Sequence, residues 1–540
     1  MKITFSSLIL GAILWGSFPA ALRSQSHKEK AAAAAEFRTS DRCVACHNGM
    51  KTSTGQDFSI GFDWRASVMA NAARDPYWQA SVRRESMDHP ESHATIEDEC
   101  STCHMPIAHF ANRDAGRKTT VFAHLPLDKN PMGPAADGVS CSVCHQVQEK
   151  GLGTEATFNG NVAIAKVVKG NLRPEYGPFV VDRGHQTVMQ SSTGGFIPEQ
   201  GNQIRDAALC GSCHTLYTTA RGPGGVAIGK LPEQMPFKEW QHSDYPTKET
   251  CQTCHMPVVK EAVPVTAVYG PLHDGVRRHV FVGGNFILEE FLQDHRKELS
   301  TQALPQELNA AIQQTTRFLQ TQSARITIRD IHAAPGSLAI DVQVQNLTGH
   351  KLPTAYPSRR VWLHVIVRDA NGRAVFESGA LNPDGSIAGN DNDADPSRFE
   401  PHYRQITNAR QVEIYEPILK DSQGRVTTGL LNAVGYLKDN RLLPSGFDKA
   451  TAETDIAVIG RAADDPDFND QGSLVRYVVS TGTAPGPFRI AAELWYQPIG
   501  FRWAHNLALY PASEPQRMVR YYEQASGRSA VMLARAGKTR

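Results

Sequence analysis

The clearest chemistry in the sequence comes from cysteines and histidines that recur at one fixed spacing. All ten cysteines fall into five copies of Cys-x-x-Cys-His, and none is left over. The cysteine pairs are Cys43 and Cys46, Cys100 and Cys103, Cys141 and Cys144, Cys210 and Cys213, and Cys251 and Cys254. The histidines that complete the motifs are His47, His104, His145, His214 and His255. Two thiols at this spacing can add to the two vinyl groups of one haem, and the following histidine is placed to bind its iron. The pattern predicts five covalently bound haem c groups.

Three other uses of Cys-x-x-Cys fit less well. A four-cysteine zinc site pairs two such units, but five is an odd number and zinc needs no histidine after each unit. A thioredoxin-like redox pair occurs once, in a βαβ setting. Disulfide bonds do not repeat one tight spacing five times. Haem attachment therefore remains the prediction.

The spacing of the motifs also predicts how their part of the chain is built. The motifs begin at Cys43, Cys100, Cys141, Cys210 and Cys251, which leaves roughly 50 residues per haem over residues 40–285. A segment of that size cannot enclose an apolar core of its own. We therefore expect a loop-rich, mainly helical domain over residues 40–285, with the haems forming much of its interior.

The motif region resembles the multihaem c-type cytochromes related to the tetrahaem cytochrome of ammonia-oxidising bacteria. Gly138-Val139-Ser140-Cys141 and the residues to His145 are similar to the third haem site of that family. Trp64, with a ligand position five residues on, is similar to the segment that follows the first site. The family has a histidine at that position and this chain has Met69. If Met69 binds iron, that haem is His/Met ligated and its potential is higher, because a thioether favours the ferrous state.

The chemistry of each haem depends on the residue on the second side of its iron, since six-coordinate irons transfer electrons and open ones bind small molecules. Fifteen histidines lie outside the motifs, and sequence alone does not pair them with haems. His279 resembles a ligand position of the family. The suspected distal ligands are Met69, His124, Met189, His279 and His350. If His350 is a ligand, the C-terminal part of the chain is docked on the haems.

The rest of the chain has a different pattern. Helical periodicity interrupted by Pro305 predicts a helical connector over residues 286–323. Alternating apolar residues and the Asn371-Gly372 pair then predict an antiparallel β-sandwich over residues 324–512, followed by a helix or tail over 513–540. The segment Asn346-Leu-Thr-Gly-His350-Lys-Leu-Pro is similar to a β-domain of larger multihaem cytochromes. The predicted fold class is therefore α+β with several domains.

Asp391, Asp393 and Asp395 alternate along one loop of the predicted β-domain. Alternate carboxylates can bind calcium, which takes several hard oxygen ligands. No downstream glutamate completes the usual loop, so a solvated acidic turn is the favoured interpretation.

The N-terminus and the overall charge indicate the compartment and exclude some partners. Lys2 followed by an apolar stretch has the layout of a signal peptide, and residues 1–24 are assigned to it, with an uncleaved anchor as the alternative. No later stretch is long and apolar enough to span a bilayer, so we expect no integral membrane segment in the mature chain. With 56 Lys and Arg against 55 Asp and Glu, the chain lacks the basic excess of nucleic-acid binders. We expect an exported protein, in the periplasm or at the cell surface.

These features predict an electron-transfer protein. Its partners would be a redox protein or quinone-linked donor and an acceptor, and self-association through the β-domain is a further option. The alternative is an enzyme, a haem reductase or oxidase of a small nitrogen or sulfur compound with one five-coordinate haem. Each motif ends in His, so the sequence has no sign of a specialised catalytic haem.

Overall fold

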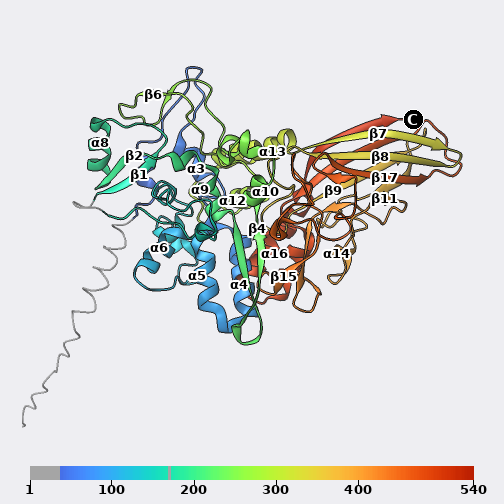
Figure 1. Cartoon of the computed structure of the whole chain (residues 1–540), viewed down its shortest axis with the longest axis horizontal. Helices are drawn as coiled ribbons and strands as arrows, with labels where there is room; N and C mark the ends of the chain where they lie inside the picture. The colour runs from blue at the N-terminus through green and yellow to red at the C-terminus, as the bar shows by residue number, and fades with distance from the viewer. Residues whose placement is uncertain (1–36, 168–171) are drawn as a thin grey trace, which may run out of the picture.

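The structure is a computed structural model that describes residues 37–167 and 172–540. The predicted signal peptide, residues 1–24, lies outside the described residues. The chain folds into a motif-bearing part and a part built mainly of sheets, which lie at opposite ends of the long axis in Figure 1. Helices and mostly antiparallel sheets both occur, in agreement with the predicted α+β class. Among the described residues, no helix has the length and apolar character needed to cross a membrane.

The motif-bearing part consists of helices joined by long loops. Its helices are α2 (Asp41–Val44), α3 (Ile60–Arg65), α4 (Pro76–Asp88), α5 (His93–His104), α6 (Pro106–Asp114), α7 (Cys141–Cys144), α8 (Arg183–Thr193), α9 (Ala207–Cys213), α10 (Pro236–Gln241) and α11 (Cys251–His255). Its strands form three pairs, β1 (Arg173–Gly177) with β2 (Phe196–Gln200), β3 (Leu216–Arg221) with β4 (Ala227–Gln234), and β5 (Val263–Pro264) with β6 (Leu272–His273). Most of the helices span only one or two turns, so tertiary packing rather than helix length must hold them in place.

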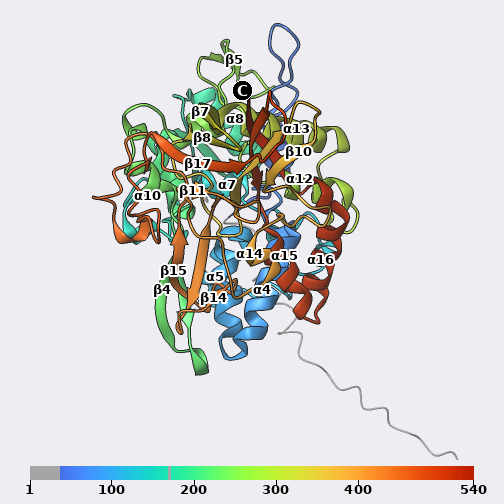
Figure 2. The same ribbon diagram turned by 90° about the vertical axis from the view of Figure 1, so that its right-hand side faces the viewer.

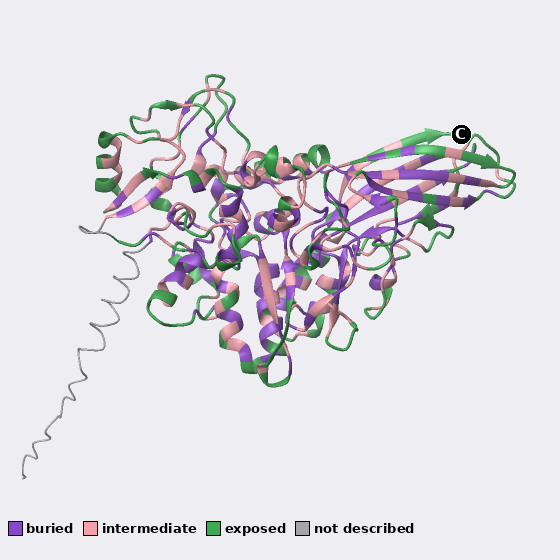
Figure 3. Ribbon diagram, viewed as in Figure 1, coloured by how far each residue is buried: buried purple, intermediate pink, exposed green. Residues whose placement is uncertain are grey.

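Buried apolar residues are distributed unequally between the two parts. In the motif-bearing part most fall into small separate clusters, such as the one around Ile96 and Met105 and the one around Phe110. One much larger cluster runs through the connector and the sheets. Figure 3 shows this difference as a dense buried interior at the sheet end. The small clusters agree with the expectation that this part has little apolar core of its own.

Two helices connect the parts, α12 (Phe286–Asp294) and α13 (Pro305–Gln322). Pro305 occupies the first turn of α13, where its missing N–H costs nothing, and Glu307 accepts a hydrogen bond of 2.9 Å from the backbone N–H of Leu304. Glu307 also pairs with Arg65 of α3, which ties the connector to the motif-bearing part.

The sheet part contains two five-stranded sheets. The strands of the first are β10 (Ala374–Ser378), β9 (Arg360–Arg368), β18 (Arg489–Gln497) and β19 (Val531–Thr539), with β12 (Ile414–Tyr415) paired to β9. The strands of the second are β11 (Gln405–Ile406), β17 (Gly472–Ser480), β8 (Ser337–Asn346) and β7 (Ala324–Ala334), with β16 (Phe468–Asn469) paired to β17. Alternate residues such as Val342, Val365 and Leu494 are buried and belong to one shared core. A smaller sheet holds β13 (Pro417–Asp421), β14 (Val426–Thr427) and β15 (Ala433–Asp439).

The end of the chain contains the predicted helix, but a strand follows it. Helices α15 (Phe501–His505) and α16 (Ser513–Ala525) are followed by β19, which pairs antiparallel with β18. Residues 531–539 are thus an edge strand of a sheet, although Ala and Arg in this stretch favour helix. Pairing with β18 overrides that local preference. Helix α16 packs on α4 (Figure 2). An ion pair of 2.9 Å joins Arg83 to Glu514.

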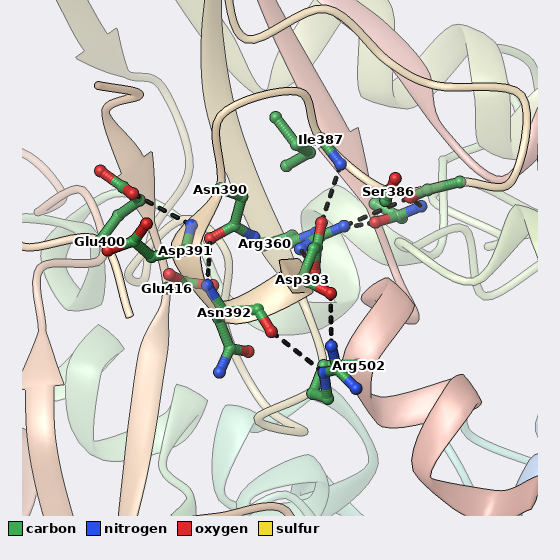
Figure 4. Close-up of polar contacts among 12 residues, drawn as sticks. Arg360, Ser386, Ile387, Asn390, Asp391, Asn392, Asp393, Glu400, Glu416 and Arg502 are labelled. Carbon is green, nitrogen blue, oxygen red and sulfur yellow. Dashed lines mark hydrogen bonds and ion pairs between the residues drawn. The ribbon is translucent and has the colours of Figure 1, made fainter. Parts of the chain in front are cut away.

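The acidic loop of the sheet part is neither a calcium loop nor a fully solvated turn. It contains the short helix α14 (Asp391–Ala394), shown in Figure 4. Asp391 pairs with Arg398, while Asp393 is buried and pairs with Arg360 at 2.7 Å. Arg502 donates to backbone carbonyls of the same helix. Asp391 and Asp393 thus form internal ion pairs, while Asp395 accepts hydrogen bonds from the backbone N–H and the hydroxyl of Ser397.

Candidate haem-binding site

Each Cys-x-x-Cys-His motif lies on or at the end of a helical turn. Helices α2, α5, α7, α9 and α11 carry the five motifs in chain order. Residues three apart on a helix share one face, so both thiols of a motif point the same way and the histidine follows directly. All ten cysteines lie within the described residues and form no disulfide there.

Four of the five motif histidines are anchored through the Nδ1 atom. Hydrogen bonds join Nδ1 of His47 to Val265 O (2.6 Å), His104 to Ala72 O (2.9 Å), His145 to Tyr176 O (2.6 Å) and His255 to Val282 O (2.5 Å). Metal-binding histidines characteristically donate their second ring N–H to such a carbonyl, which fixes both tautomer and ring orientation. In these four rings Nε2 is left as the nitrogen that could bind a metal.

His145 faces the suspected distal ligand His279. Their ring centres lie 6.4 Å apart, and their planes differ by 20°. A metal–imidazole bond is about 2 Å long and the ring centre lies about 1 Å behind the nitrogen, so two rings on opposite sides of one iron have centres about 6 Å apart. This separation fits a bis-histidine iron and is too long for direct ring contact.

His255 faces His350 in the same way. The ring centres are 6.3 Å apart, and the planes differ by 13°. His350 belongs to the loop between β8 and β9, so one member of the pair comes from each part of the chain. Nδ1 of His350 is also anchored, at 2.8 Å from the carbonyl of Lys351.

The paired histidines are in the protonation state that binds iron. Burial lowers the pKa of His279 to about 3 and that of His350 to about 4. Burial likewise lowers the pKa of His145 and His255, although hydrogen bonds to backbone carbonyls oppose the shift. The rings are therefore neutral at physiological pH, as an iron ligand must be.

The other three motif histidines have no second histidine ring at this separation among the described residues. The ring of His104 instead stacks on Trp78, with centres 4.4 Å apart and planes that differ by 2°. His214 has an accessible face, yet burial lowers its pKa to about 4. The nearby charges of His255, Arg359 and His350 lower the pKa of His214 further.

The remaining suspected ligands, Met69, His124 and Met189, stay predictions. The carbonyl of Met69 accepts a hydrogen bond of 3.0 Å from Val139 N, just before the third motif. His124 lies in the loop whose neighbours pack around Cys100. Met189 is on the partly buried face of α8. No contact with a motif histidine is recorded for these three side chains in the described part.

Thiol contacts between different motifs place the five sites close together. The thiols of Cys43 and Cys141, Cys103 and Cys213, and Cys210 and Cys251 interact closely enough that each pair shifts the pKa of its members. Burial and the nearby charge of Cys213 raise the pKa of Cys144 to about 12, so motifs three and four are also neighbours. Because each sulfur would be bonded to a porphyrin edge, neighbouring sulfurs bring the edges of neighbouring porphyrins together.

A buried network of charges lies behind His350. Lys351 Nζ lies 2.8 Å from Asp439, and Arg441 contacts both Asp439 (2.7 Å) and Glu239 of α10 (2.9 Å). Glu239 also accepts a hydrogen bond of 3.2 Å from the backbone N–H of Lys351. All four side chains are at most 5% exposed. The network joins the loop of His350 to the motif-bearing part.

Sequence reasoning missed the ring of Trp78 and this network. Trp78 gives no local signal, because its contact with His104 depends on how α4 packs against α5. Lys351 directly follows His350, and a charged residue inside an otherwise apolar loop could have drawn attention to it. No group of three or more His, Cys, Asp or Glu residues suited to bind a metal ion by itself occurs in residues 37–167 and 172–540.

Comparison with known proteins supports the fold. No protein-family profile matches the chain. A search of curated proteins finds no match. The structure is similar to that of a penta-heme cytochrome c552 from Thermochromatium tepidum, with a TM-score of 0.52 and 16% sequence identity over 94% of this chain and 99% of that one. The chain thus has, over nearly its whole length, the fold of a penta-heme cytochrome.

Proposed function

We propose that the chain is an exported c-type cytochrome that transfers electrons through five covalently bound haems. The observation that carries the proposal is the pair of opposed histidines, His145 with His279 and His255 with His350, at the separation of bis-histidine iron. When bound, haem iron supplies a one-electron Fe(III)/Fe(II) couple. Two strong nitrogen ligands keep small molecules off the iron, which suits electron transfer.

Interactions between cysteines of different motifs place neighbouring haem sites side by side. Thiol contacts link motif one to three, two to four, and four to five, and the charge interaction of Cys144 with Cys213 links three to four. Motif four is thus the branch point of the array. Every site has a neighbour, so electrons that enter at one end could reach the others without leaving the protein.

In this proposal the sheet part has a function of its own, because it supplies an iron ligand. His350 comes from the loop between β8 and β9, and the buried network of Glu239, Arg441, Asp439 and Lys351 holds that loop on the motif-bearing part. We propose that the two sheets form a β-sandwich whose task is to supply and fix this ligand. Periplasmic location, a redox protein or quinone-linked donor, a separate acceptor and self-association belong to the same proposal.

The test is the mass and the electron count of the exported holoprotein. Intact mass should exceed the mature chain by five haems, and reductive titration should take up five electrons per chain. Replacing Cys210 and Cys213 with Ser should remove one haem and one electron. A holoprotein with fewer than five electron equivalents would contradict the five haems. One that turns over nitrite or hydroxylamine at a steady rate would contradict the carrier and favour the enzyme.

A further inference from the structure

Arg359, which directly precedes β9 in the sheet part, has polar contacts that leave its charge unbalanced. One terminal nitrogen donates to the carbonyl of Thr354 and the other to Oδ1 of Asn285, both at 3.0 Å. Its Nε is buried and has no hydrogen-bond partner in the described part. Among residues 37–167 and 172–540, no carboxylate forms an ion pair with Arg359. A guanidinium in such a place is costly unless an anion accompanies it.

A second donor without a partner lies beside it. Tyr496 of β18 is 2% exposed, and its hydroxyl group is buried without a hydrogen bond in the described residues. That hydroxyl lies 2.4 Å from where a Cβ at Gly284 would be, so it touches the turn that also holds Arg359 through Asn285. Burial raises the pKa of Tyr496, and the positive charge of Arg359 opposes the rise.

Arg359 lies close to the site formed by His255 and His350, and this position indicates which group it could bind. Thr354, whose carbonyl accepts a hydrogen bond from Arg359, belongs to the same loop as His350, so Arg359 lies near the distal ligand. On the other side, the turn that holds Arg359 follows Val282, whose carbonyl anchors His255. A side chain that contacts the chain segments on both sides of one site can reach the edge of the ring between them. The edge of a haem carries two propionate carboxylates.

We propose that Arg359 and Tyr496 bind a propionate carboxylate of the haem held by Cys251, Cys254 and His255. The inference rests on the proposed function and deepens it, because it assigns to the sheet part a second contact with the same cofactor. Arg359 Nε–H and the Tyr496 hydroxyl both donate, and a carboxylate accepts both. The guanidinium then balances the propionate charge beside the iron.

The test is a potentiometric titration of the holoprotein, followed by visible absorption and electron paramagnetic resonance. In Arg359→Gln the propionate loses its counter-charge, which favours ferric iron. We expect the reduced-to-oxidised ratio of one bis-histidine haem to fall about tenfold at a fixed potential, which corresponds to about 59 mV for one electron. Arg359→Lys should retain most of the potential, and Tyr496→Phe should shift the same haem in the same direction by less. Resonance Raman spectra of Arg359→Gln should show altered propionate bending vibrations.

The matched control is Arg476→Gln, which removes an arginine that pairs with Asp341 on the sheet part. It should leave all potentials unchanged. The proposal is overturned if Arg359→Gln and Tyr496→Phe hold five haems with wild-type potentials and propionate vibrations. Should Arg359→Gln fail to fold, Tyr496→Phe decides, since it removes a single hydroxyl. A wild-type protein that carries fewer than five haems would instead contradict the proposed function.

Discussion

The imidazole rings of His255 and His350 face each other with centres 6.3 Å apart, although one lies in the last Cys-x-x-Cys-His motif and the other in a loop of the sheet part. Under the proposed function, this relationship makes the sheet part the source of one iron ligand. It also explains why a charged network is buried at the junction, since an iron ligand must be held in a fixed place.

Replacing His350 with Ala should leave one iron without its distal ligand. Electron paramagnetic resonance of the oxidised protein should then show one additional high-spin haem per chain, while intact mass still gives five haems. His332→Ala, an exposed histidine on β7, is the control and should change nothing. An unchanged low-spin count in His350→Ala would refute the pairing with His255.

Replacing His279 with Ala should act in the same way on the site of His145, because the two rings have the same kind of separation. The double variant His279→Ala with His350→Ala should show two high-spin haems. A single high-spin haem in the double variant would mean that both histidines serve one site, against the assignment made here.

The buried network behind His350 should contribute to stability. Lys351→Met leaves Asp439 and Glu239 with Arg441 alone, so the free energy of unfolding of the sheet part should fall by about 3 kcal/mol. Chemical denaturation followed by far-ultraviolet circular dichroism measures it. Lys248→Met breaks an exposed pair with Asp244 and should cost under about 1 kcal/mol. If the two variants lose the same free energy of unfolding, the buried network stabilises the protein no more than an exposed ion pair does.

His402 should make the sheet part sensitive to alkaline pH. It is buried between Glu413 (2.7 Å) and Asp465 (3.0 Å); burial disfavours its charge, but the two carboxylates outweigh burial and raise the pKa of His402 to about 9. Its stabilisation is complete below the unfolded-state pKa of about 6.5 and is lost as pH rises to about 9. His402→Gln should lower stability at pH 6 and flatten the decline between pH 6.5 and 9. Thermal unfolding of both proteins across this range tests the prediction, and parallel curves would contradict it.

Glu289 of α12 should make the folding stability depend on pH over a lower range than His402 does. Burial raises its pKa to about 8, and Thr315 donates to it at 3.0 Å. The folded protein therefore holds a proton that the unfolded chain releases near pH 4.5, so stability declines as pH rises from about 4.5 to 8. Glu289→Gln, which mimics the protonated form, should stabilise on the order of 3 kcal/mol at pH 8 and have little effect at pH 4.5. Equal midpoints of denaturation at pH 8 would show that Glu289 ionises freely.

The sequence predicts the haem-attachment motifs far better than it predicts which distal histidine faces each motif. The thiols and histidine of one motif lie within five residues, so local spacing suffices to recognise them. Pairing His145 with His279, or His255 with His350, depends on how distant segments pack, which no local pattern encodes. The same holds for Arg359 and Tyr496, because their proposed role depends on how distant segments pack at the turn around Gly284.

The sheets illustrate the same limit. Alternation from Ile340 to Val344 and from Val361 to Val367 indicates strands correctly, because burial on one face leaves a period of two. Strand β19 was missed because its Ala and Arg residues favour helix, and only pairing with β18 makes it a strand. The relation to the tetrahaem family and the roles of Met69, His124 and Met189 remain predictions.

Electron paramagnetic resonance of the oxidised holoprotein, with spin quantified per haem, tests the central claim most directly. The account predicts five low-spin ferric haems per chain, at least two of them with the signal shape of bis-histidine iron, and no response to nitrite, hydroxylamine or nitric oxide. A high-spin haem that shifts when one of these compounds is added would contradict the electron carrier and place an active site at that iron.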